Sequence, residues 1–128
     1  MRTRHLTTII AGVLLATACT KEKPLVAAVL HAKCRDCIVS YAAGVAQSKK
    51  DTLRARWDPA AGDSVPEEGQ WTVHLQDGDN IFLKACRLGQ DTAMGNIDLW
   101  VGGGVGAMEA HADTAQQCAQ INQAAHAQ

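Results

Sequence analysis

The chain has 128 residues, of which 20% are charged and 4% aromatic, and its formal net charge at pH 7 is −1. This length suits one small domain, and the lack of a basic excess argues against a nucleic-acid-binding protein. So few aromatic side chains predict a modest hydrophobic core that needs reinforcement.

Residues 1–18 have the pattern of an export signal. Arg2 and Arg4 precede an apolar run at 6–15, and small residues follow at 16–18, which is the order found in secretory signal peptides. The apolar run is too short to cross a bilayer core, which takes about 20 apolar residues. Without residues 1–18, 110 residues remain with 10 basic and 13 acidic side chains, so the formal charge becomes −3.

The segment Leu15-Ala16-Thr17-Ala18-Cys19 resembles the lipobox of bacterial lipoproteins. The resemblance covers residues 1–23. It implies that Cys19 is acylated with palmitate-type chains and begins a lipidated tether at 19–24. Ala16 stands where the family usually has leucine, and Ala16-Thr17-Ala18 also fits ordinary signal peptidase, so a freely secreted or periplasmic product is the alternative. Thr20, in place of aspartate, implies the periplasmic face of a Gram-negative outer membrane over the inner membrane.

Four cysteines remain if Cys19 carries lipid, and they are Cys34, Cys37, Cys86 and Cys118. An even number in an oxidising compartment predicts two disulfides. All three pairings stay open, but loop-closure entropy favours long-range bridges. Closing residues 37 to 118 stabilises by roughly 4–5 kcal/mol, and closing 34 to 37 by about 2 kcal/mol.

Segment 25–128 is predicted to form a single domain that begins and ends with a helix. Apolar residues at spacings of 3 and 4 predict an amphipathic helix over 25–47. The stripe consists of Val26, Leu30, Cys34, Cys37, Tyr41 and Val45. A second helix is predicted from 107 to about 126, with Met108, Ala112, Ala115, Cys118 and Ala119 on one side.

Alternating apolar and polar residues predict four short strands between these helices, at 53–57, 71–76, 81–88 and 97–101. Segment 58–69, with two prolines and two glycines, is predicted to be a long exposed loop, and 89–96 another. The turn signal at 77–80 predicts a hairpin. The expected fold is therefore α+β: a small antiparallel sheet of about four strands, flanked by two helices and stapled by two disulfides.

Three motifs bear on chemistry. Cys34-x-x-Cys37 is compatible with a thiol–disulfide redox pair whose thiolate lies at a helix N-terminus, although structural disulfides are the preferred interpretation. His31 and His111 lie near cysteines, but a closed zinc site needs four convergent ligands and the spacings do not supply them. Residues 102–107 match G-x-G-x-x-A, yet no strand and acidic residue follow at about 20 positions as a dinucleotide site requires. A linker or tight turn is expected there.

These observations favour a non-enzymatic protein of the cell envelope. The predicted partners are a membrane, through the lipid on Cys19, and another envelope or secreted protein, as for inhibitors, immunity or exclusion proteins and secretion accessories. No cofactor, metal, nucleic acid or small-molecule substrate is predicted. The alternatives are a periplasmic redox protein that uses Cys34 and Cys37 and a purely structural lipoprotein. Trp57, Trp71 and Trp100 are expected in the core, unless one is exposed on the sheet as a binding patch.

Overall fold

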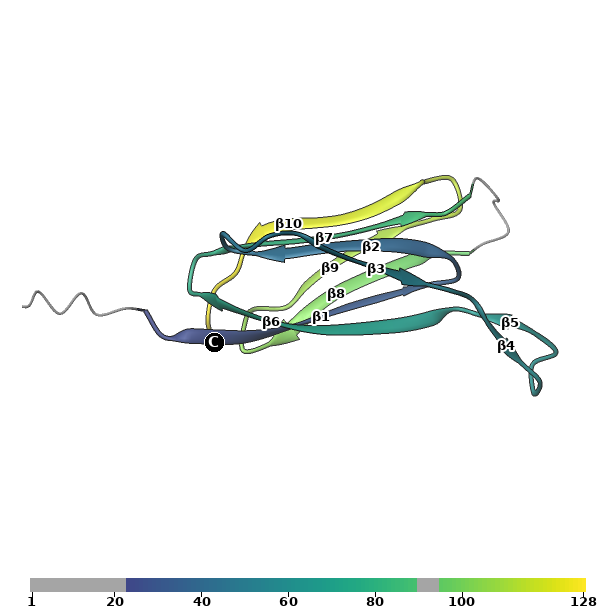
Figure 1. Ribbon diagram of the computed structural model, residues 1–128, viewed down its shortest axis with the longest axis horizontal. Coiled ribbons are helices and arrows are strands. Elements are labelled where there is room, and N and C mark those ends of the chain that lie inside the picture. The colour runs from purple at the N-terminus through teal and green to yellow at the C-terminus, as the bar shows by residue number, and fades with distance from the viewer. Residues whose placement is uncertain (1–22, 90–94) are drawn as a thin grey trace, which may run out of the picture.

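The computed structural model describes residues 23–89 and 95–128. These residues form two packed four-stranded antiparallel sheets and a small two-stranded hairpin (Figure 1). The predicted export segment and Cys19 lie outside the described residues. In chain order the strands are β1 (Leu25–Cys34), β2 (Cys37–Ala43), β3 (Lys49–Leu53), β4 (Arg56–Asp58), β5 (Asp63–Val65), β6 (Glu67–Gln76), β7 (Asn80–Arg87), β8 (Ile97–Gly103), β9 (Met108–Ala112) and β10 (Cys118–Ala124).

Strands that follow one another in the chain often belong to different sheets. Sheet A has the order β6-β1-β8-β9, sheet B has the order β10-β7-β2-β3, and β4 pairs with β5 alone. The chain therefore crosses between the sheets after β1, β6, β7 and β9, and also from β3 to β6 through the β4–β5 hairpin. Each sheet is held by partners that are distant in sequence, such as β1 with β6 and β8.

The two ends of the sandwich carry different features. β1 begins at one end, which also holds the β2–β3 and β6–β7 connections and the C-terminus (Figure 1). The β4–β5 hairpin projects from the opposite end, where β1 turns into β2 (Figure 1). We call the first the proximal end and the second the distal end.

The core lies between the sheets and is filled from both by alternate residues. In β1 the buried positions are Ala28, Leu30, Ala32 and Cys34, which are separated by two residues because successive strand side chains point to opposite faces. The other aliphatic side chains among the largest fully buried ones are Val39, Ile81, Leu83, Ile97, Leu99, Val101, Val105 and Ile121. Several inward positions are alanines, which contribute little apolar side-chain surface to the core.

The predicted α+β class is wrong, because the described residues contain strands and no helix. Segment 25–47 forms β1, β2 and the start of the β2–β3 connection. A spacing of four satisfies a strand as well as a helix, because it is twice the strand period of two. The single spacing of three, from Cys34 to Cys37, is where the chain passes from sheet A to sheet B. The apolar residues of two strands joined by a short turn thus have the same spacing as one face of a helix.

The predicted C-terminal helix is also wrong, because residues that match a helical spacing lie on two separate strands. Met108, Ala110 and Ala112 face inward from β9, and Ala119 and Ile121 face inward from β10.

The connection at 113–117 is held by Arg87, a largely buried residue of β7. Its Nε donates to the carbonyl of Gln116 at 3.0 Å and its Nη2 to the carbonyl of Asp113 at 2.7 Å.

The strand predictions are better, but their connections need correction. The predicted strands at 71–76, 81–88 and 97–101 correspond to β6, β7 and β8, whereas 53–57 is split between β3 and β4. The turn at 77–80 is present, with Gly78 at φ 88°. It does not form a hairpin, because β6 belongs to sheet A and β7 to sheet B. The predicted long loop at 58–69 contains β5 and the start of β6, and 90–94 of the second loop lie outside the described residues.

The glycine-rich segment after β8 is a tight structural turn. The N–H of Gly104 donates to the carbonyl of Ala27 at 2.8 Å. A Cβ on Gly104 would lie 3.0 Å from that carbonyl oxygen and 2.6 Å from Cγ1 of Val26. The glycine therefore allows two backbones to approach closely, which is the expected tight turn and has no strand–helix context for a nucleotide.

Candidate functional site

The outer face of sheet A carries a regular array of polar and aromatic side chains. Because β6, β1, β8 and β9 are adjacent and in antiparallel register, residues on them line up in rows. One row consists of Gln70, His31, Trp100 and Glu109. The next consists of Glu68, Lys33, Asp98 and His111, in which acidic and basic residues alternate.

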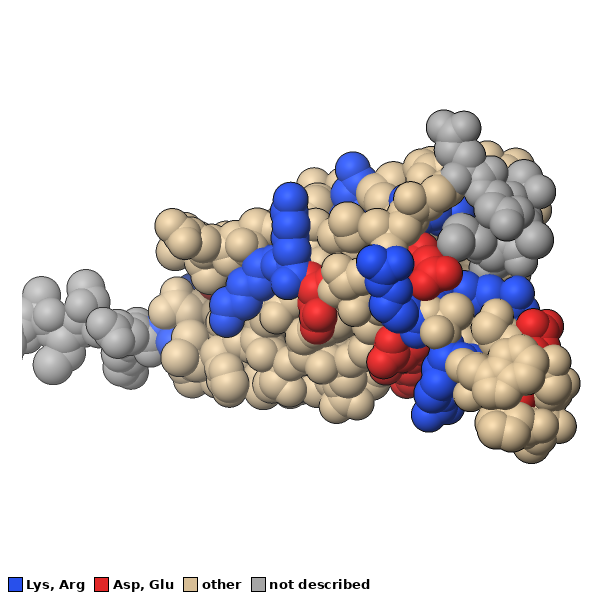
Figure 2. Space-filling model, turned by 45° about the vertical axis from the view of Figure 1, so that its right-hand side comes forward, with Lys and Arg blue, Asp and Glu red and all other residues tan. Residues whose placement is uncertain are grey.

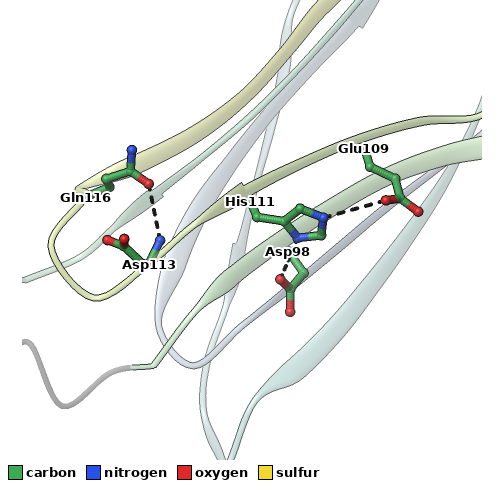
Figure 3. Close-up of polar contacts among 5 residues, drawn as sticks. All are labelled: Asp98, Glu109, His111, Asp113 and Gln116. Atoms are coloured by element: carbon green, nitrogen blue, oxygen red, sulfur yellow. Dashed lines mark hydrogen bonds and ion pairs between the residues drawn. The ribbon is translucent and has the colours of Figure 1, made fainter.

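His111 lies between two carboxylates on this face (Figure 3). Its Nδ1 is 2.8 Å from Oδ1 of Asp98, its cross-strand partner, and its Nε2 is 3.7 Å from Oε2 of Glu109. The hydrogen bond to Asp98 and the negative charges of Asp98 and Glu109 raise the pKa of His111 above 6.5, although desolvation opposes this shift. The site thus favours a protonated imidazole at the solvent-exposed edge of sheet A.

His31 and Trp100 form the aromatic centre of the neighbouring row. Their rings stack with centroids 4.9 Å apart and an interplanar angle of 8°. His31 Nδ1 is 3.7 Å from Oε1 of Glu68, and this nitrogen is buried without a hydrogen-bond partner. The predicted core position of Trp100 is therefore wrong, because its ring covers the outside of the sheet, where an aromatic ring is available for contact with a partner.

The distal hairpin is fastened to the sandwich by backbone donors and carboxylate acceptors. The N–H of Arg54 donates to Oε2 of Glu67 at 2.9 Å, and the N–H of Ala55 donates to Oδ1 of Asp36 at 3.1 Å. Trp57 follows on β4 with 64% of its surface exposed, so its predicted core position is also wrong. Its indole is therefore available for contact with a partner.

A hollow of about 370 Å³ joins the hairpin to the charged row of sheet A. It is lined by Lys33, Arg56, Pro66, Glu67 and Glu68. Lys33 and Glu68 belong to both features, so the sheet face and the hairpin base are continuous. Figure 2 shows Lys, Arg, Asp and Glu side chains of both signs close together around this end of the molecule. Such a mixed surface suits a polar protein partner more than an anionic polymer.

The four predicted disulfide cysteines form two bridges, Cys34–Cys37 and Cys86–Cys118. Cys34 ends β1 in sheet A and Cys37 begins β2 in sheet B, so the first bridge ties the two sheets at the distal end. The second joins cross-strand partners on β7 and β10. The preference for linking Cys37 to a distant cysteine is therefore wrong, although the second bridge does close a long stretch of chain.

The redox alternative assumes that a thiolate of Cys34 or Cys37 lies at a helix N-terminus, and the structure differs from this. The two residues are 1% and 0% exposed, and they flank a turn between strands. There is accordingly no helix N-terminus at the pair to stabilise a thiolate. Within the described ranges, no three histidine, cysteine or carboxylate side chains are placed to hold a metal ion, and no helix there is long and apolar enough to cross a membrane.

Comparison of the chain with protein-family models, curated proteins and solved structures finds no match. The candidate surface therefore rests on the geometry alone. Sequence reasoning missed the rows on sheet A, because they depend on which strands are neighbours. Period-two alternation at Asp98 and Trp100 was visible, but it could not show that the outer partners would be His111 and His31.

Proposed function

We propose that this protein is a lipid-anchored, non-enzymatic binding domain of the bacterial cell envelope. It is held by acylated Cys19, at the periplasmic face of the outer membrane, and it contacts another envelope or secreted protein. The lipobox-like segment supports the anchor, and the sheet A rows with the exposed distal hairpin support the protein contact. A chain that is cut by ordinary signal peptidase would be free in the periplasm but would present the same surface.

One observation carries the proposal: β1 starts at the proximal end, while Trp57 and the charged hollow lie at the distal end (Figure 1). A tether of six residues at 19–24 reaches roughly 20 Å at most, at about 3.5 Å per residue. An anchor on Cys19 would thus keep the proximal end near the membrane and direct the hairpin away from it. The geometry matches the needs of a protein that captures a partner from the periplasm.

The redox alternative is less well supported. A catalytic cysteine must be accessible as a thiolate, whereas Cys34 and Cys37 are buried in a bridge between the two sheets. The bridge has an evident structural task at that corner. We therefore assign both disulfides to stability.

The proposal is tested in cells of a Gram-negative host with a photo-crosslinking amino acid at position 57 or at position 120. Gln120 is the control because it is also exposed but lies on the outer face of sheet B, on the border strand β10. We expect a discrete protein adduct from position 57 that disappears with the charge reversal Arg56→Glu, and none from position 120. Mass spectrometry of the purified chain should show acylated Cys19. An unmodified N-terminus refutes the anchor, and equal or absent adducts at both positions refute the distal binding surface.

A further inference from the structure

The outer border of β6 is a free strand edge. β6 is the last strand of sheet A and pairs with no described strand except β1. Its partner across the sandwich, β3, has five residues against ten in β6 and pairs with β2 only from Cys37 to Tyr41. The other side of the molecule is different, because there β9 and β10, both sheet borders, pack alongside each other.

Hydrogen bonds at Gln76 show which backbone groups of β6 face this free border. Its N–H donates to Oδ2 of Asp79 at 3.0 Å, and its carbonyl accepts from the N–H of Asp79 at 3.0 Å, so both groups face away from β1. The β1–β6 register is unbroken over the whole strand, and antiparallel residues alternate between facing the partner and facing away. The N–H and C=O groups of His74, Thr72 and Gln70 therefore also point to the free border.

This border lacks the devices that usually protect a strand edge. Such edges typically carry lysine, other charges or proline. β3 has Lys49, Lys50 and Asp51, but residues 69–76 of β6 contain no lysine, arginine, aspartate, glutamate or proline. An unprotected edge of this length is a template for another strand.

An open seam between the sheets runs beside the same edge. Toward the distal end Trp71 closes it, because its ring stacks on Tyr41 at 5.3 Å between centroids and its Nε1 donates to Oδ2 of Asp51 at 3.1 Å. Toward the proximal end two hollows of about 220 and 420 Å³ keep it open. They share Ala43, Ala46 and His74 in their linings, so they form one continuous groove along β6.

The groove has lysine side chains available to a partner, whereas its carboxylate is already hydrogen-bonded. Lys49 is the only lysine, arginine, aspartate or glutamate lining the first hollow in the described part of the chain, and Lys50 is exposed next to it on β3. Asp79 lines the second hollow, but its carboxylate is already bound to the N–H of Gln76. The groove thus complements an acidic side chain beside apolar ones.

We propose that β6 and this groove bind an extended segment of another polypeptide as an added strand of sheet A. Its backbone pairs with Gln70, Thr72 and His74, its inward aliphatic side chains fill the seam, and an acidic residue contacts Lys49. This is strand addition at a sheet edge, in which the backbone gives affinity and the alternate side chains give selectivity. The site is separate from the distal surface and does not depend on lipidation of Cys19.

The test uses the full chain in detergent micelles and two synthetic probes, Asp-Val-Thr-Val-Thr-Val-Asp and the same peptide with lysine at both ends. We expect NMR shifts along 70–76 with the acidic peptide and slower hydrogen exchange at the amides of Gln70, Thr72 and His74. The lysine peptide should bind roughly threefold to fivefold more weakly, because a partly exposed charge contact contributes only modestly to affinity.

Two variants, each with a control variant, make the test specific. Thr72→Pro removes an N–H that faces the border and not one that bonds β1, so it should abolish binding, whereas Thr72→Val keeps the N–H and should retain it. Lys49→Glu should reverse the preference between the peptides, and Lys84→Glu on the outer face of sheet B should not. Lys49 is exposed, so its variant decides the question even if Thr72→Pro disturbs folding.

Three results would overturn the proposal. One is that neither peptide shifts the amides of 70–76. Another is that Lys49→Glu leaves the peptide preference unchanged. The third is that the amides of Thr72 and His74 are already protected in the free chain, since this would mean that the edge is covered. Protection that grows with protein concentration would assign the cover to a second copy, and constant protection would assign it to the chain itself.

Discussion

At the scale of single residues, the outer face of sheet A is organised around ionisable groups that only the fold brings together. His111 and Asp98 are 13 positions apart in the sequence but directly opposite on β9 and β8. Glu109 lies two residues before His111 and hence on the same face. The imidazole is therefore flanked by negative charge while it remains in contact with solvent.

We expect an NMR titration of the His111 ring to give a pKa above 6.5, because the hydrogen bond to Asp98 and the two carboxylate charges favour the protonated form. Asp98→Asn should lower this pKa more than Glu109→Gln does, since Asp98 makes the closer contact. Because the folded-state pKa is raised, this contact stabilises the fold below about pH 6.5 and the contribution is lost as the pH rises through the raised value. Equal pKa values in the wild type and Asp98→Asn would contradict the assignment.

The tryptophans show what could be predicted at this scale. The predicted core position of Trp71 is confirmed in that its partly buried ring packs against the core cluster from β6. Trp57 and Trp100 sit in equally good alternating patterns but face outward. Alternation shows that a residue lies on one of two faces, but it does not show which face is covered by the second sheet. Trp57 is exposed, as the alternative of an outward-facing tryptophan requires.

At the scale of elements, the strand pattern of the first segment is hard to recognise because its apolar residues fit both the helical and the strand period. The four-residue spacing from Val26 to Leu30 to Cys34 is helical and also strand-like, and alanine, which is frequent in these segments, favours helices. Tertiary pairing decides against the helix, because Ala28 and Ala32 fill the narrow space between the sheets. Segments with β-branched and aromatic residues, such as 71–76, were recognised because local preference and final structure agree.

The close packing of the turn after β8 predicts how a substitution at Gly104 changes the stability of the fold. Gly104→Ala should lower the free energy of unfolding by about 1–3 kcal/mol, as overpacking at a tight contact does. Its Cβ would meet the Ala27 carbonyl oxygen at 3.0 Å, and that oxygen cannot move without loosening its hydrogen bond to Gly104. Chemical denaturation measures the change.

Gly106→Ala is the matched control for this junction. No heavy atom lies within 4 Å of the Cβ position at Gly106, so the change should stay within about 0.5 kcal/mol. Similar losses for the two variants would show that general loss of glycine flexibility, and not close packing against Ala27, determines the stability of the turn.

At the scale of the whole molecule, chain crossings between the sheets separate the binding features from the predicted anchor. Because β1 runs the full length of the sandwich, the residue that starts it and the turn that ends it lie at opposite ends. The Cys34–Cys37 bridge holds that turn, and the hairpin is attached beside it through Asp36. A lipid at the start of the chain would therefore define which end of the domain is presented to the periplasm.

This geometry predicts an upright orientation on a membrane. In nanodiscs that contain lipids with chelated gadolinium, the methyl groups of Val45 at the proximal end should relax faster than the methyl of Ala60 in the distal hairpin. Both residues are exposed, so the difference would reflect distance from the lipid and not burial. A Cys19→Ser chain added to the same nanodiscs should show enhancement at neither residue, because it has no acyl chain. Equal enhancement at both residues of the lipidated chain would mean that the sandwich lies flat on the membrane, with the distal surface no longer directed toward a partner.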